Sequence, residues 1–182
     1  MTDFELNTVI VSILIAFALT GILSSWGRLV EARGRVHRPW LSAAASGWVF
    51  LSLIAHWLDV SAYRDFDFHR NYESLLFFIP SILGAAVAFV FTPSVPDEGE
   101  LDLERHYFAV APWGYRLAAA YVAFAGVADL LVPDEASTPR IFTIAITSTL
   151  LLLSFAKRPR FHGAGLVLLW IVHVIKFSVG TR

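Results

Sequence analysis

The chain has 182 residues, of which 57% are hydrophobic and 16% are charged, and its mean hydropathy is +0.63. Soluble domains are about a quarter charged, so this composition excludes an ordinary soluble surface and is typical of a membrane protein. The formal net charge of −1 argues against nucleic-acid binding, which needs a basic patch. The lack of cysteine excludes disulfides, thiolate nucleophiles and iron–sulfur clusters.

Apolar runs with few charges predict six transmembrane helices, because a spanning helix needs about 20 apolar residues. In chain order the predicted spans are 6–27, 39–62, 73–95, 113–132, 140–156 and 161–180. No connection is long enough for a soluble domain, so we expect one all-α, polytopic six-transmembrane-helix bundle. The acidic start of the chain, Met1–Glu5, indicates that the first span is retained and not cleaved as a signal peptide.

The basic residues of the loops predict the orientation of the bundle, because cytoplasmic loops carry an excess of lysine and arginine. Nine basic residues fall on one side: Arg28, Arg33, Arg35, Arg38, Arg105, Arg116, Lys157, Arg158 and Arg160. Five fall on the other side: Arg64, Arg70, Arg140, Lys176 and Arg182. We therefore expect the first side to face the cytoplasm and both termini to face outward (N-out/C-out).

Ionisable residues inside a membrane are costly and are often functional. In the predicted spans they gather in the outer half of the bilayer: Glu5, His56, Asp59, Glu73, Asp129, His173 and Lys176. The inner half has no comparable set apart from Arg116, whose long side chain can reach the interface. Helical spacing puts His56 and Asp59 on one face of the second helix, and His173 and Lys176 on one face of the sixth. If these faces converge, they surround one polar cavity in the outer leaflet.

Three kinds of site could use such a cavity. The leading hypothesis is a protein that binds or conducts an ion, proton or small solute, with His56, Asp59 and His173 as binding or relay groups and Lys176 tuning their charge. Glu5 and Glu73 would then guard the mouth. The first alternative is a redox subunit, in which His56 and His173 are the axial ligands of a haem b or a quinone occupies the same place.

A divalent metal held by His56, Asp59 and His173 is the third kind of site, although neither an HxxxH nor an HxxE pattern occurs. The structural alternative to all three is a pair of buried neutral histidines with ion pairs at the interface. The chain has no GxSxG, HExxH or glycine-rich phosphate motif, so no enzyme activity is indicated.

Two features indicate protein contacts. Residues 97–108 are acidic and then aromatic, as expected either for a strip that docks a partner or for a solvated stretch leading into the fourth helix. Small residues, including Gly47, Gly84 and Gly126, recur at four-residue spacing, which favours close helix packing inside the bundle or in a homo-oligomer. A scaffold or accessory subunit that docks a membrane partner is therefore a second alternative function.

Three stretches of the sequence carry a family resemblance. They are Phe4-Glu5-Leu6, the run from Thr20 to Leu29 (TGILSSWGRL), and the run from Leu101 to Phe108 (LDLERHYF). In these stretches the chain resembles an uncharacterised family of small six-helix bacterial inner-membrane proteins. The resemblance implies a bacterial inner membrane and six spans, and it assigns no catalytic or cofactor residue.

Overall fold

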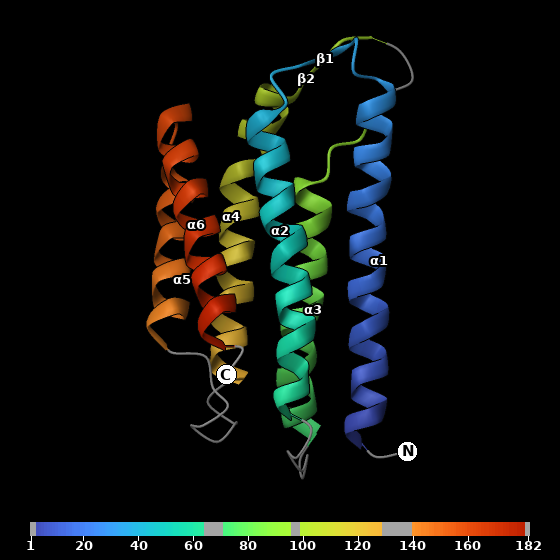
Figure 1. Ribbon diagram of the computed structural model, residues 1–182, viewed down its shortest axis with the longest axis vertical. Helices are drawn as coiled ribbons and strands as arrows, with labels where there is room; N and C mark the ends of the chain where they lie inside the picture. Colours follow the sequence, from blue (N-terminus) through green and yellow to red (C-terminus); the bar gives the residue numbers. More distant parts are fainter. Residues whose placement is uncertain (1–2, 64–70, 96–98, 129–139, 181–182) are drawn as a thin grey trace.

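The computed structural model describes residues 3–63, 71–95, 99–128 and 140–180, and these residues form six α-helices (Figure 1). The helices are α1 (Asp3–Glu31), α2 (Trp40–Asp59), α3 (Asn71–Phe91), α4 (Leu103–Ala128), α5 (Arg140–Phe155) and α6 (Pro159–Gly180). A 3-10 turn, η1 (Val60–Tyr63), continues α2, and two short strands, β1 (Val36–His37) and β2 (Leu101–Asp102), pair with each other. The predicted all-α class is confirmed.

Successive helices run in opposite directions along the long axis of the molecule (Figure 1). Helix α1 begins and α6 ends at the same end of the bundle, which we call the terminal end. The paired strands and the turn between α5 and α6 lie at the opposite end, which we call the strand end. Eight of the nine basic residues that predicted the orientation belong to the loops and helix ends on the strand side. The ninth, Arg116, was predicted as a loop residue but lies within α4, with its guanidinium over the ring of Phe155.

Helix α2 is central to the packing, because it contacts α1, α3, α4 and α6. Helix α1 packs on α2 and α3 at one side of the bundle, and α5 packs on α4 and α6 at the other. The buried face of α1 repeats every three or four residues, as a helix with one packed face requires: Asn7, Val11, Ile15, Ala18, Ile22 and Ser25.

Small residues allow the helices to approach one another closely inside the bundle. A Cβ added to Gly47 would lie 3.2 Å from the Trp170 ring, and one added to Gly84 would lie 2.9 Å from Leu53. A Cβ at Gly126 would lie 2.5 Å from a methyl carbon of Thr143. The small-residue faces therefore pack against neighbouring helices of the same chain.

Large apolar side chains cover much of the outer surface. Phe17 is 65% exposed, Leu152 is 73% exposed and Phe155 is 70% exposed. Two helical segments, Phe4–Glu31 and Trp40–Asp59, are long and apolar enough to cross a membrane, and 77–91 and 140–155 are shorter apolar helices. These features indicate membrane association, whereas the count of six spans stays a prediction.

The fourth helix begins earlier than the predicted span. It starts at Leu103 and not at Trp113, because the Asp102 side chain accepts hydrogen bonds from the backbone N–H groups of Glu104 and Arg105 and so caps the helix. The prediction followed apolar runs alone and therefore took these charged residues as loop. The helix extends beyond its apolar part.

The first and third loops are joined at the strand end, which the sequence did not predict. Val36 pairs with Leu101 and His37 pairs with Asp102 in parallel register. Arg35 donates to the carbonyl of Gly99 at 3.1 Å, and Arg38 lies 3.4 Å from Glu104. Gly99 has a φ of +88°, which favours glycine at this turn. The described acidic residues of the third loop thus contact the basic first loop or cap α4, while Asp97 and Glu98 lie outside the described residues.

Candidate functional site

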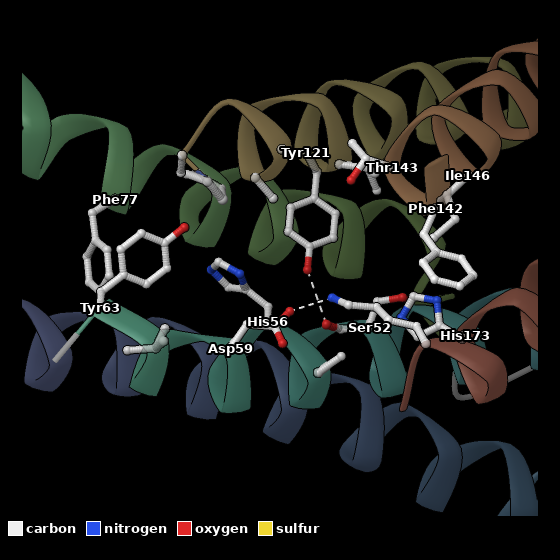
Figure 2. Close-up of a pocket in the computed structure, with 18 residues that line it drawn as sticks. Ser52, His56, Asp59, Tyr63, Phe77, Tyr121, Phe142, Thr143, Ile146 and His173 are labelled. Atoms are coloured by element: carbon white, nitrogen blue, oxygen red, sulfur yellow. Dashed lines mark hydrogen bonds and ion pairs between the residues drawn. The ribbon is translucent and has the colours of Figure 1, made fainter. Parts of the chain in front are cut away.

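A cavity lies near the terminal end of the bundle, between α2, α3, α4, α5 and α6 (Figure 2). Helix α2 lines it with Ser52, His56 and Asp59, and α6 lines it with His173 and Lys176. These positions are three or four residues apart in each helix, so each set occupies one helical face. The structure therefore brings together four of the seven ionisable residues singled out in the sequence.

An ion pair links the two helices across the cavity. The ammonium of Lys176 lies 2.5 Å from Oδ2 of Asp59, and the two side chains are 20% and 41% exposed. A carboxylate accepts hydrogen bonds at two oxygens and an ammonium donates three, so the pair has capacity for an ion or water that enters the cavity. The charges of Asp59 and Lys176 both act on the rings of His56 and His173.

His56 connects α2 to α3 and α4. Its Nε2 lies 2.9 Å from the hydroxyl of Ser81, a fully buried residue of α3, and its ring meets Tyr121 of α4 edge-on. Tyr121 donates a hydrogen bond to the backbone carbonyl of Ser52 at 3.1 Å. These contacts hold the imidazole at the cavity wall in a fixed orientation.

His173 lies on the other side of the ion pair from His56 in Figure 2. It is 5% exposed, and its ring packs edge-on against the buried Trp48 of α2, with the ring centroids 5.9 Å apart. The two imidazoles therefore have different neighbours, although both belong to the same cavity.

The volume of the cavity limits what it can hold. It is about 60 Å³, and one water molecule needs about 10–15 Å³ on the same scale. A few water molecules, a proton or a small ion fit this space. Pockets for larger organic ligands have volumes of about 300–1,000 Å³.

The other predicted site residues are not brought to the cavity by described contacts. Glu5 lies on an exposed part of α1, and α1 contributes no residue to the lining described. Glu73 belongs to the first turn of α3, but its side chain lies outside the described part of the structure, and so does all of Asp129. Their predicted role at a mouth stays a prediction.

The geometry of the described residues bears on the predicted metal site, and the haem site is a matter for spectroscopy. Among these residues, no group of three His, Asp or Glu side chains could hold a metal ion, so His56, Asp59 and His173 do not form a ready ligand set. The bis-histidine haem b, with His56 and His173 as ligands, stays a prediction that the absorption spectrum of the purified protein tests.

Two further residues that matter for the cavity line it and were not among the predicted site residues. Tyr121 carries a hydroxyl into it, and Thr143 of α5 closes against Gly126 of α4. Tyr121 was not singled out in the sequence. The residues three and four positions away from it in α4 are apolar, so no local polar periodicity marked it: Leu117, Ala118, Phe124 and Ala125.

A second polar cluster lies toward the strand end, where the sequence analysis expected no comparable set. The hydroxyl of Tyr107 lies 2.6 Å from that of Tyr115 and 2.7 Å from Nδ1 of His162. His162 is fully buried, and its Nε2 donates to the carbonyl of Ala156 at 3.0 Å. Because Nε2 carries the hydrogen, Nδ1 of the neutral ring accepts from Tyr107, and Tyr107 accepts from Tyr115.

One face of α6 contains both polar sites. His162, Leu166, Leu169, His173 and Lys176 follow one another at spacings of three or four residues, and the first four are buried. Two leucine layers thus separate the cavity from the Tyr107–Tyr115–His162 cluster. The periodicity that predicted His173 and Lys176 would have found His162 if it had been extended by three turns toward the start of the helix.

Comparison with protein families, with characterised proteins and with solved structures found no match for this chain. The function is therefore argued from the cavity and from the surface of the molecule.

Proposed function

We propose that the chain is a six-span membrane protein with both termini outside, and that the cavity binds a proton or a small ion that enters from the outer side. The observation that carries the proposal is the convergence of the Asp59–Lys176 ion pair and two imidazoles on a cavity of about 60 Å³. This volume favours a proton or small ion over a larger solute.

The exposed apolar surface supports the membrane part of the proposal. Monomeric soluble proteins rarely expose contiguous apolar patches larger than a few hundred Å². Here large apolar side chains are exposed on helices from α1 to α6, among them Ile13, Ile144 and Val167. Alternating helix directions and basic residues at the strand end are consistent with a cytoplasmic strand end.

Ion binding is tested by thermal unfolding of the detergent-purified protein in a panel of small cations and anions at constant ionic strength. A ligand present at 100 times its Kd stabilises the folded state by about 2.7 kcal/mol, so we expect a rise in Tm of several degrees with the ion that binds. The double variant His56→Ala/Asp59→Asn should lose this response.

A matched control is available at the opposite end of the bundle. His37 and Glu100 lie 3.8 Å apart and are exposed, so His37→Ala/Glu100→Gln removes the same kinds of group away from the cavity. This control should keep the response. An equal response in all three proteins, or no response to any ion or to pH, would contradict the proposal.

Passage across the membrane is tested separately in liposomes that contain a trapped pH indicator or ion indicator. If the bound species crosses the two leucine layers, the wild type and the control double variant should dissipate an imposed gradient, and the cavity double variant should not. Binding without flux would identify the cavity as a binding or sensing site only.

A further inference from the structure

A groove of about 490 Å³ lies at the strand end, between the last turns of α1 and the start of α2. Trp26, Leu29, Val30, Val36 and Ala43 form its apolar walls, and Arg33 is the charged residue among its lining residues. The indole nitrogen of Trp26 already donates to Ser46 at 3.0 Å. The walls therefore offer little hydrogen bonding, and any ligand must bring an apolar segment.

The arginines near the groove differ in their partners. Arg35 donates to Gly99, and Arg38 pairs with Glu104, so both hold the third loop. Within the part of the chain that the structure describes, the guanidinium group of Arg33 makes no hydrogen bond or ion pair, and no acidic side chain lines the groove. The rim of the groove thus carries positive charge without a protein counter-charge.

The groove continues into the apolar surface of α1. Val30, which lines it, is 67% exposed, and Leu23, two turns earlier in the helix, is 52% exposed. An apolar chain that enters beside Arg33 can therefore extend along α1 toward the middle of the bundle. A cationic rim above an apolar channel matches a phospholipid, whose charged phosphate and apolar acyl chain are covalently joined.

We propose that this groove binds one anionic phospholipid from the inner leaflet, with its phosphate on Arg33 and one acyl chain between α1 and α2. The inference rests on the proposed membrane location with the strand end inside, and it does not depend on ion binding at the cavity. Anionic charge is required because the uncompensated Arg33 would favour it over a zwitterionic headgroup.

Native mass spectrometry of the detergent-purified protein tests the site with 1-palmitoyl-2-oleoyl-phosphatidylglycerol and the phosphatidylcholine with the same chains. We expect one phosphatidylglycerol to stay bound more strongly than phosphatidylcholine. Arg33→Gln should lower the bound fraction of phosphatidylglycerol about fivefold, the typical effect of one basic residue near an anionic headgroup. Ala43→Phe, which fills the groove with a ring, should reduce binding of both lipids.

Arg160→Gln is the matched control, because it removes one exposed arginine at the same end of the bundle but outside the groove. Equal losses in Arg33→Gln and Arg160→Gln would overturn the site in favour of general surface charge. Equal retention of the two lipids by the wild type would overturn the anionic specificity, and a bound peptide mass in place of lipid would overturn the lipid as occupant. Because the readout is bound mass, a failed ion response at the cavity leaves this result independent.

Discussion

Single hydroxyl groups determine the hydrogen bonding of the buried Tyr107–Tyr115–His162 cluster. Tyr107 occupies the middle position, since it donates to His162 and accepts from Tyr115. Removing the Tyr107 hydroxyl leaves the Tyr115 hydroxyl without an acceptor and Nδ1 of His162 without a donor. Removing the Tyr115 hydroxyl leaves the hydrogen bond from Tyr107 to His162 in place, so no buried donor loses its acceptor. A buried polar group left without a partner costs about 1–3 kcal/mol.

We expect Tyr107→Phe to lower the free energy of unfolding by about 2–3 kcal/mol and Tyr115→Phe to lower it by about 1 kcal/mol. Tyr121→Phe, which loses one hydrogen bond to a backbone carbonyl, is the control for a single lost hydroxyl. Denaturant unfolding in detergent measures all three. Equal costs for Tyr107→Phe and Tyr115→Phe would show that the chain of donors does not run in this direction.

At the residue scale, the sequence predicted those site residues whose common helical face follows from their spacing alone. His56, Asp59, His173 and Lys176 lie on two such faces, and the structure places them around one cavity. Ser81 and Tyr121 could not be predicted as their partners, because that requires the rotation of α3 and α4 about their axes. His162 lies inside the predicted sixth span, 161–180, but the periodic face of that span was followed only through His173 and Lys176.

At the scale of helices, the closeness of α3 and α4 depends on Gly114. A Cβ at this position would lie 2.7 Å from the Phe91 ring and 3.1 Å from Val90. Phe91 is 2% exposed and packs against Tyr107 and Tyr115, so it has little room to move. Added volume here must separate the two helices.

We expect Gly114→Ala to destabilise the protein by about 1–3 kcal/mol, as overpacking of a core does. Gly27→Ala is its control, since Gly27 is also helical but has no neighbouring atom within 4 Å of the added Cβ. The control should raise stability by about 0.5–1 kcal/mol, because alanine favours a helix over glycine. Thermal unfolding measures the pair, and the same sign for both changes would contradict this packing.

The presence of each helix was easier to predict than the residues at which it begins and ends. Long apolar runs fixed the number of helices, whereas the start of α4 depends on the cap at Asp102 and the strand pairing depends on two loops far apart in the sequence. Neither contact leaves a hydrophobic pattern. The residues between α4 and α5 lie outside the described ranges, and these include Asp129 and the predicted end of the fourth span at 132.

At the scale of the whole molecule, the orientation in the membrane is the property that both proposals share. The chain contains no cysteine, so single introduced cysteines give labelling without background. Gly34 at the strand end has open space around an added Cβ and tolerates such a change. Thr2 serves as the second position, near the start of the chain.

We expect Thr2→Cys to react with a membrane-impermeant maleimide on intact cells, and Gly34→Cys to react only after the membrane is permeabilised. The physical reason is the excess of arginine and lysine at the strand end, which retains that end in the cytoplasm. Mass-tag gel shifts measure both. Labelling of Gly34→Cys on intact cells would place the strand end outside and contradict the orientation.

The strand pair also orders events during synthesis. Val36 and Leu101 are separated by the whole of α2 and α3, and chains emerge from the ribosome N-terminal end first. The pairing can therefore form only after three helices and the third loop have been made. Until then, α1 is held mainly by its single packed face against α2 and α3. The strand pair adds a second attachment, so α1 is synthesised first but is fully fixed in the bundle only after the third loop has been made.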